Sequence, residues 1–283
     1  MDRIILTVGG IQRNYLLFKP PPKPHPDSSP GPLVMFLHGK GATAHWADAE
    51  TGWSDFAARN GFALILPQAL AMNPEHPPRF LTNPTRWQDK EGEADVVFLS
   101  DAMKDAAARV GADSRRVFVT GFSNGAAMAF RLAAELADRV AAVAPVAGHC
   151  SLPAPRPVRA IPTLYLIGSA DPLIPLRGGV VRDPWQHRYV SRPPVVETLE
   201  KWARAIGCDP VPVAEEGREG ASVRLDTYPG PVLYRSIAIE GLGHHWPGGK
   251  GQFNHRIAGP PSDIVNGTEL VWDFFRGQLE QLE

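Results

Sequence analysis

The sequence predicts an α/β protein whose mainly parallel central sheet carries helices on both faces. Apolar runs rich in β-branched and aromatic residues recur along the chain, and segments with helical spacing lie between them. Strands buried on both faces have this composition, and crossover helices connect parallel neighbours. The pair Gly9-Gly10 lies between the first two runs and is typical of a hairpin turn. We therefore expect the sheet to open with an antiparallel N-terminal hairpin before it becomes parallel.

The individual elements follow from these runs and from the residues that bound them. Gly111 and Gly207 come directly after helical segments and occupy the positions of C-terminal helix caps. The expected strands cover residues 4–8, 15–18, 33–39, 62–68, 117–123, 141–148, 163–169 and 236–241. The expected helices cover residues 47–60, about 92–111, 124–138, about 194–206 and 263–280.

Proline and glycine are frequent in this chain, with 29 and 27 residues among 283. Both interrupt helices and strands, so the chain requires many shaped loops, where functional residues tend to lie. The prolines concentrate in loops at 19–32, 69–86, 172–194 and 247–261. A linker is the alternative for 19–32, but the strands on both sides belong to one pattern. We expect that segment to be an exposed loop of a single domain that spans residues 1–283.

Composition excludes several kinds of partner. The 29 Lys and Arg residues nearly balance the 30 Asp and Glu residues, so no basic surface for nucleic acid or for an anionic membrane is expected. No apolar stretch reaches the roughly 18 residues of a membrane-spanning helix. The first residues lack the pattern of a signal peptide. The expectation is therefore either a cytoplasmic protein or a mature secreted form. The oligomeric state is left open, as is a disulfide bridge between Cys150 and Cys208.

A nucleophile-elbow motif follows the run VFVT. Residues 121–125 read Gly-Phe-Ser-Asn-Gly, and the helical segment AAMAFRLAAELA comes next. A tight strand-to-helix turn brings backbones close together, which requires glycine on both sides, and it exposes the serine hydroxyl at the helix N-terminus. An incidental serine in a glycine-rich turn is the alternative. The strand before the motif and the helix after it favour Ser123 as a catalytic nucleophile.

A serine nucleophile requires a base, and the base requires an acid that orients it. Asp171 follows the run TLYLIGS, at the sheet edge where parallel strands end, and Asp183 is a weaker candidate farther along the same loop. His244 follows the last strand in SIAIEGLGHHWPGG, and the neighbouring His245 would point the opposite way in extended backbone. The sequence thus predicts Ser123, Asp171 and His244 as a catalytic triad, with no metal and no cofactor.

An oxyanion hole requires two backbone donors that face the charge developing on the substrate. Asn124 follows the nucleophile at the helix N-terminus and is predicted to supply one. The segment His38-Gly39-Lys40-Gly41 follows the run LVMFL and is predicted to supply the other, from the Lys40 N–H. His38 is expected to have a structural role. The Lys40 side chain is expected either to favour acidic substrates or to be solvated.

The chain resembles the α/β-hydrolase esterases that include polyhydroxybutyrate depolymerase-like and feruloyl or acetylxylan esterase-like proteins. The stretches that carry the resemblance include LVMFLHGKGA, RVFVTGFSNGAAMAFRLAAELA, GSADPLIPLRGG and GLGHHWPGG, and it extends from about residue 3 to residue 280. It implies the α/β-hydrolase fold and the same triad. It also implies that Trp87, Ile174 and Trp246 line the acyl or alcohol pocket.

The sequence departs from this family in three respects. The loop before ADVVFL has no paired cysteines, and Ala94 stands where a second aspartate is common. Lys40 adds a cation that glycine-rich versions of its loop lack. No binding module is expected beyond residue 283, whereas depolymerases of solid polymer resemble a catalytic domain with such a module attached. Specialisation for solid polymer is therefore not expected.

These observations predict a serine carboxylic-ester hydrolase that forms an acyl-serine intermediate. The expected substrates are short-chain, hydroxyacyl or related small esters, and a feruloyl or acetylxylan esterase is the alternative. A serine peptidase would use the same triad, but the anchors for a peptide terminus that such peptidases usually have are not visible. A non-catalytic hydrolase-like binding protein predicts a damaged triad, whereas every member is present here.

Overall fold

The computed structural model describes residues 1–20, 31–71, 87, 93–113, 116–185, 187–214 and 222–280. Most of the loops predicted at 19–32 and 69–86 lies outside these residues. Within the part of the chain that is described, no helix is long and apolar enough to cross a membrane. Cys150 and Cys208 are buried free thiols, so no bridge joins them.

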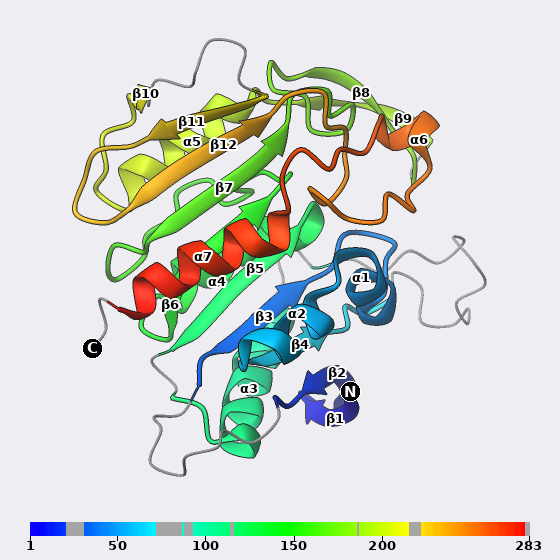
Figure 1. The fold of residues 1–283 in the computed structure, drawn as a ribbon, viewed down its shortest axis with the longest axis vertical. Helices are drawn as coiled ribbons and strands as arrows, with labels where there is room; N and C mark the ends of the chain where they lie inside the picture. The colour runs from blue at the N-terminus through cyan, green and yellow to red at the C-terminus, as the bar shows by residue number, and fades with distance from the viewer. Residues whose placement is uncertain are drawn as a thin grey trace.

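A ten-stranded sheet forms the centre of the molecule (Figure 1). Its strand order is β1-β2-β4-β3-β5-β6-β7-β12-β11-β10. The strands from β4 through β12 in this order are parallel to one another, and the pairs at both edges are antiparallel. The predicted parallel sheet with an N-terminal hairpin is confirmed. Its strands are β1 (Asp2–Val8), β2 (Ile11–Phe18), β3 (Leu33–Leu37), β4 (Ala63–Pro67), β5 (Val117–Phe122), β6 (Val140–Val146), β7 (Thr163–Gly168), β10 (Val213–Ala214), β11 (Val223–Thr227) and β12 (Tyr234–Ile239).

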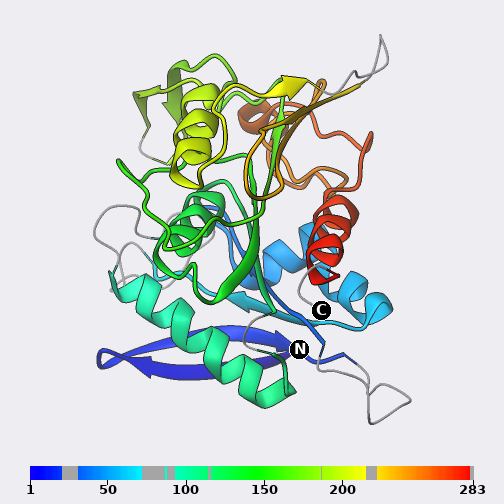
Figure 2. The same ribbon diagram turned by 90° about the vertical axis from the view of Figure 1, so that its left-hand side faces the viewer.

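Helices cover both faces of this sheet, as the view along its edge shows (Figure 2). Helices α1, α2 and α7 lie on one face, and α3, α4 and α5 lie on the other. On the first face Phe275 of α7 stacks on Phe118 of β5, and on the second Phe130 of α4 meets Trp202 of α5 edge to face. The helices are α1 (Ala44–Thr51), α2 (Trp53–Asn60), α3 (Glu93–Val110), α4 (Asn124–Glu135), α5 (Val195–Ala205), α6 (His255–Ala258) and α7 (Gly267–Leu279).

Several regions differ from the sequence prediction, which contained no element at β10, β11 or α6. The helix predicted over 47–60 is divided into α1 and α2 at Gly52, which has a left-handed backbone with φ 69°. The loop predicted over 172–194 contains a hairpin in which β8 (Gly179–Asp183) pairs with β9 (Arg188–Arg192). This hairpin forms a two-stranded sheet of its own and is largely exposed. It therefore lacks the continuous apolar run by which a buried strand is recognised.

A buried ion pair joins the N-terminal hairpin to α3. Arg13 Nη2 in β2 lies 2.6 Å from Asp95 Oδ1, and the two side chains are 2% and 3% exposed. The guanidinium also lies 4.1 Å from the ring centroid of Phe98. About three helical turns farther along α3, Tyr15 Oη donates a hydrogen bond to Asp105 Oδ2 at 2.5 Å. Burial and this carboxylate raise the pKa of Tyr15. The hairpin is thus fixed to α3 by polar contacts as well as by packing.

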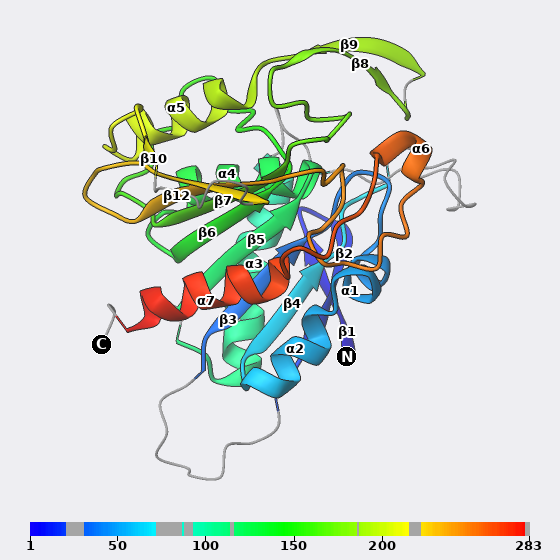
Figure 3. The same ribbon diagram turned by 45° about the horizontal axis from the view of Figure 1, so that its top comes forward.

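The strand order reverses at β3, between the loops that follow β3 and β5. From β3 the chain continues to β4 on one side, and it returns through α3 to β5 on the other side of β3. Ligands of open α/β sheets bind where strand order reverses in this way, at the carboxyl ends of the strands. Figure 3 shows the β8–β9 hairpin and α6 at this same edge.

Candidate active site

Ser123 lies in the turn between β5 and α4. Its backbone has φ 57° and ψ −114°, a combination that residues with a side chain rarely adopt. The Ser123 N–H donates to the Val146 carbonyl in β6 at 2.8 Å, which holds the turn in place. Strain of this kind costs about 1–3 kcal/mol and is found mainly at functional sites.

The glycines on either side of Ser123 permit the close packing of this turn. A Cβ on Gly125 would overlap the carbonyl oxygen of Leu37 in β3. A Cβ on Gly121 would lie 2.5 Å from the carbonyl oxygen of Gly125. The motif requires glycine on both sides of Ser123 because the start of α4 packs directly against the backbone of the neighbouring strands.

His244 connects Ser123 to Asp171. Its Nδ1 lies 2.7 Å from Asp171 Oδ2, and its Nε2 lies 2.8 Å from Ser123 Oγ. A carboxylate only accepts hydrogen bonds, so Nδ1 carries the proton and Nε2 accepts from the serine hydroxyl. His244 is 1% and Asp171 is 3% exposed, so water hardly screens their interaction. The structure thus brings together the three residues that the sequence predicts as a triad.

Asp171 is oriented by the loop in which it lies. Its Oδ1 accepts hydrogen bonds from the backbone N–H groups of Leu173 and Ile174, each at 2.8 Å. Its other oxygen therefore faces His244. Asp171 follows β7 and His244 follows β12, and these two strands are parallel neighbours in the sheet. Residues 73 positions apart in the sequence meet for this reason.

The two weaker candidates have other partners. His245 Nε2 lies 3.0 Å from the Gly259 carbonyl oxygen and donates to it. Burial lowers the pKa of His245, because the charged ring loses its hydration. Asp183 Oδ1 accepts from the Trp185 N–H at 2.8 Å, and its Oδ2 lies 3.6 Å from Lys40 Nζ.

The loop that follows β3, residues 38–42, lies against Ser123; we call it the β3 loop. A Cβ on Gly39 would lie 3.4 Å from Ser123 Cβ. The Ala42 N–H donates to the Gly39 carbonyl at 3.2 Å, and Lys40 lies within this turn. Asn124 is the first residue of α4, where N–H groups have no carbonyl partner within the helix. The two predicted oxyanion donors thus lie on backbone segments that adjoin Ser123.

The Lys40 side chain is paired within the protein. Its Nζ lies 3.6 Å from Asp183 Oδ2, and the side chain is only 12% exposed. The ammonium also lies 5.0 Å from the ring centroid of Trp185. The expectation of a solvated Lys40 side chain is therefore wrong, because the β8–β9 hairpin, which sequence analysis missed, covers it.

Trp87 supports the segments on both sides of Ser123. Its side chain is fully buried. Its backbone N–H donates to Asn124 Oδ1 at 2.6 Å, and its Nε1–H donates to the His38 carbonyl at 3.1 Å. Trp87, predicted from the resemblance to line the substrate pocket, thus ties the start of α4 to the β3 loop.

His38 is buried and neutral within the β3 loop. Its Nδ1–H donates to the Gly39 carbonyl at 2.8 Å, and its Nε2 accepts from the Ala69 N–H at 3.1 Å. The ring is 1% exposed. Burial lowers the pKa of His38 to about 4, because the imidazolium would lose its hydration, and the hydrogen bond to Gly39 and the charge of Asp95 offset this only in part.

This shift predicts that acid weakens the fold through His38. The unfolded chain takes up a proton near pH 6.5, whereas the folded chain resists it until about pH 4. Stability is therefore retained above the unfolded pKa and falls as the pH drops through this window, by about 2 kcal/mol between pH 7 and pH 5. Urea unfolding at both pH values measures the loss.

The variant His38→Gln isolates this contribution. Its stability should fall by about 2 kcal/mol less than that of the wild type between pH 7 and pH 5. His45 is an exposed histidine in α1, and His45→Gln should keep the wild-type dependence. An unchanged pH dependence in His38→Gln would contradict a neutral, buried His38.

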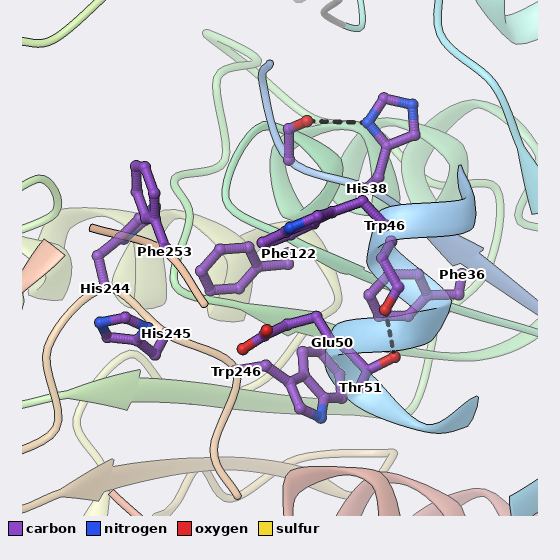
Figure 4. Close-up of a pocket in the computed structure, with 12 residues that line it drawn as sticks. Phe36, His38, Trp46, Glu50, Thr51, Phe122, His244, His245, Trp246 and Phe253 are labelled. Carbon is purple, nitrogen blue, oxygen red and sulfur yellow. Dashed lines mark hydrogen bonds between the residues drawn. The ribbon is translucent and has the colours of Figure 1, made fainter. Parts of the chain in front are cut away.

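A small pocket lies beside His244 (Figure 4). In this view Phe253 and His244 lie on one side and Trp46 and Phe36 on the other, with Phe122 between them. The space available to the centre of a water-sized sphere is about 10 Å³, which corresponds to roughly one water molecule. Because aromatic side chains form most of its walls, the pocket suits a small apolar group.

Glu50 fixes one wall of this pocket. Its Oε1 accepts from the Gly251 N–H at 2.7 Å and its Oε2 accepts from the Gln252 N–H at 3.1 Å. The buried carboxylate of α1 is thereby satisfied by the loop that follows His244. The contact holds the helix and the loop together across the pocket.

The remaining predicted pocket residues are buried as well. Trp246 is 2% and Ile174 is 7% exposed. Trp246 lines the pocket and donates its Nε1–H to Thr268 Oγ1 at 3.0 Å. Sequence reasoning missed Trp46 and Phe253 as pocket residues. Trp46 lies one helical turn before Glu50 on α1, and both residues line the pocket. The helical spacing of residues directly after the β3 loop is therefore the signal by which Trp46 could have been found.

The described residues contain no group of three or more His, Cys, Asp or Glu side chains placed to hold a metal ion. His149 precedes Cys150 in the sequence, and its Nδ1 lies 3.0 Å from Thr198 Oγ1. Burial and, to a lesser extent, the cations Arg192 and Lys201 lower the pKa of His149 to about 4. The ring is therefore neutral.

Comparison with known proteins gives concordant matches. Residues 24–190, more than half of the chain, match the family described as Phospholipase/Carboxylesterase. The chain is 32% identical over 291 residues to NocK of Nocardia uniformis subsp. tsuyamanensis, a protein assigned as an esterase, and the match covers 96% of this chain and 81% of NocK. It is 35% identical over 136 residues to poly(3-hydroxyalkanoate) depolymerase C of Paucimonas lemoignei, which covers 48% of this chain and 31% of that one.

A solved structure has the same fold. The acetyl xylan esterase from Aspergillus awamori superimposes with a TM-score of 0.60 at 16% sequence identity, over 87% of this chain and 94% of the other. At this identity the likeness concerns the fold, and it confirms the α/β-hydrolase architecture that the sequence predicts. Together, the family match, the similarity to NocK and this fold show that the chain belongs to the phospholipase/carboxylesterase family of α/β-hydrolases.

Proposed function

We propose that this esterase-family protein hydrolyses small carboxylic esters through an acyl-serine intermediate on Ser123. The observation that carries the proposal is the position of His244. Its Nε2 lies 2.8 Å from Ser123 Oγ while its Nδ1 lies 2.7 Å from Asp171 Oδ2. A base within hydrogen-bonding distance of a hydroxyl, itself oriented by a buried acid, is the arrangement that activates serine.

In the first half-reaction Ser123 attacks the ester carbonyl. His244 Nε2 takes the hydroxyl proton as the bond from Oγ to carbon forms, and the Asp171 carboxylate stabilises the imidazolium. The backbone N–H groups of Lys40 and Asn124 bind the oxygen on which negative charge develops. When the tetrahedral intermediate collapses, the bond to the alcohol oxygen breaks and the alcohol leaves with the proton from His244. The acyl group stays on Ser123.

The second half-reaction repeats these roles with water. His244 takes a proton from the water molecule as its oxygen attacks the acyl carbonyl. The same two N–H groups bind the oxyanion. Ser123 Oγ then leaves the carbonyl carbon and recovers its proton from His244, which releases the acid. This sequence of steps requires no cofactor.

The favoured substrates are esters whose acyl group is short or carries a hydroxyl group. The pocket beside His244 offers about 10 Å³ to the centre of a water-sized sphere, and its aromatic walls leave room for a small apolar group rather than for a phenolic ring. The similarity to poly(3-hydroxyalkanoate) depolymerase C supports esters of hydroxy acids. A feruloyl or acetylxylan esterase is the alternative within the same chemistry.

A substrate panel tests this proposal. We expect kcat/KM for 4-nitrophenyl acetate and for hydroxybutyrate oligomers to exceed that for methyl ferulate by at least about tenfold, because a pocket discriminates against groups that it cannot enclose. Acetylated xylan completes the panel. A 4-nitroanilide matched to the acetate ester should not be turned over. The peptidase alternative predicts the opposite result, so this substrate separates the two. Turnover confined to methyl ferulate would contradict the preference for small acyl groups.

A further inference from the structure

The β8–β9 hairpin lies over the carboxyl edge of the sheet and has one buried face (Figure 3). Val180 and Tyr189 are 72% and 74% exposed, whereas Val181 and Asp183 are buried. The two strands pair with each other in a sheet separate from the central one. A two-stranded hairpin is only marginally stable alone, so the contacts of its inner face determine where it lies.

That inner face contacts the β3 loop. Lys40 Nζ lies 3.6 Å from Asp183 Oδ2, with the two side chains 12% and 7% exposed. The ammonium lies 5.0 Å from the ring centroid of Trp185, in the turn of the hairpin. Trp185 also packs against Gly41, where a Cβ would lie 2.6 Å from Trp185 Nε1. The glycine next to Lys40 thus makes room for the indole.

Trp185 connects the β3 loop to the loop that carries His244. Its ring stacks on Phe253, with centroids 6.2 Å apart and planes at 25°. Phe253 in turn lies edge-on to His244 at 6.5 Å. One indole therefore contacts the segment of the proposed oxyanion donor and a residue that packs against the proposed base.

Asp183 is oriented toward Lys40 by the hairpin turn. Its Oδ1 accepts the Trp185 N–H at 2.8 Å, which leaves Oδ2 directed at the ammonium. Two opposite charges that are mostly shielded from water attract each other more strongly than an exposed pair. The contact restrains the side chain of Lys40, whose N–H is the proposed oxyanion donor.

We propose that Asp183 is a positioning residue, which holds Lys40 with the help of Trp185 and so keeps the Lys40 N–H in place for the oxyanion. This inference rests on the proposed function, since it concerns the same reaction. The ammonium itself does not touch substrate in this role. Donors of an oxyanion hole act only when they are held within about 0.5 Å of their position, so a displaced β3 loop lowers kcat more than it raises KM.

The variant Asp183→Asn tests the role. Its amide oxygen still accepts from the Trp185 N–H, but the charge that faces Lys40 is gone. We expect kcat for 4-nitrophenyl acetate to fall by about ten- to hundredfold, with KM changed by less than about threefold. Lys40→Met removes the charge from the other side and keeps the backbone N–H, so its loss should be similar. The double variant should lose no more than either single one, because both remove the same ion pair.

Affinity for a trifluoromethyl ketone separates positioning from a merely structural role. The ketone accepts Ser123 Oγ to form a hemiketal whose oxygen is an oxyanion, so its Kd reports the donors. In Asp183→Asn this Kd should rise by the factor by which kcat/KM falls. The loss of a mostly buried charge should lower the midpoint of thermal unfolding, but the protein should remain folded at the assay temperature. Asp273→Asn breaks an exposed pair with Arg276 on α7, and this control should leave all three quantities unchanged.

Each remaining outcome is decisive. Wild-type kcat and inhibitor affinity in both Asp183→Asn and Lys40→Met would overturn the inference and leave the proposed function intact. Losses that add in the double variant would overturn it as well, since the two side chains would then act independently. A wild-type protein without ester turnover would overturn the proposed function and, with it, this inference.

Discussion

Replacement of Ser123 by alanine should lower kcat/KM for 4-nitrophenyl acetate by about 10⁵-fold, because the nucleophile of both half-reactions is lost. The hydroxyl is the group 2.8 Å from His244 Nε2. Removing it breaks one hydrogen bond at the site and leaves the packing of the turn unchanged. We therefore expect the free energy of unfolding to change by less than about 1 kcal/mol.

Steady-state kinetics and urea unfolding on the same preparations check both parts of this prediction. Ser151 is an exposed serine in the loop after Cys150, so Ser151→Ala is the matched control and should keep wild-type kinetics. Retention of more than about one per cent of kcat/KM by Ser123→Ala would remove Ser123 from the mechanism, since only a small residual rate survives the loss of a nucleophile.

The largest expected effect on stability comes from Asp95→Ala. This change leaves the Arg13 guanidinium buried, at 2% exposure, without the carboxylate that lies 2.6 Å from it. Removing one partner of a buried pair leaves an uncompensated charge and typically costs about 3–5 kcal/mol. Chemical denaturation should therefore show a large decrease in the free energy of unfolding.

Two comparisons make this prediction specific to the buried charge. Asp273→Ala removes an exposed partner of Arg276 and should cost less than about 1 kcal/mol. The double variant Arg13→Met/Asp95→Leu removes both charges and should be more stable than Asp95→Ala, because no charge is left unpaired. Equal losses in Asp95→Ala and Asp273→Ala would contradict the account of the pair.

Much of the fold could be predicted because buried parallel strands have a distinctive composition. The runs that became β3, β5, β6 and β7 are buried at every position, so their sequences are almost continuously apolar. The β8–β9 hairpin has no such run, because one face is solvated and it pairs only with itself. The break between α1 and α2 was missed because one glycine within a helical pattern is often tolerated, whereas Gly52 adopts a left-handed backbone.

The candidate site could be predicted where local sequence imposes geometry. A serine between glycines after a strand forms one kind of turn, and residues that follow adjacent parallel strands lie side by side, which accounts for Ser123, Asp171 and His244. The contact between Lys40 and Asp183 could not be predicted, because it depends on where an exposed hairpin folds back. The same holds for the narrow pocket, whose walls come from segments far apart in the chain.

The most direct test of the central claim is covalent labelling of the wild-type protein with a fluorophosphonate. Attack by an activated serine oxygen on phosphorus expels fluoride and leaves a stable phosphonyl adduct. Peptide mass spectrometry should place a single adduct on Ser123, and Ser123→Ala should remain unlabelled under the same conditions. A folded wild-type protein that stays unlabelled, or that carries the adduct on another residue, would contradict an activated nucleophile at Ser123.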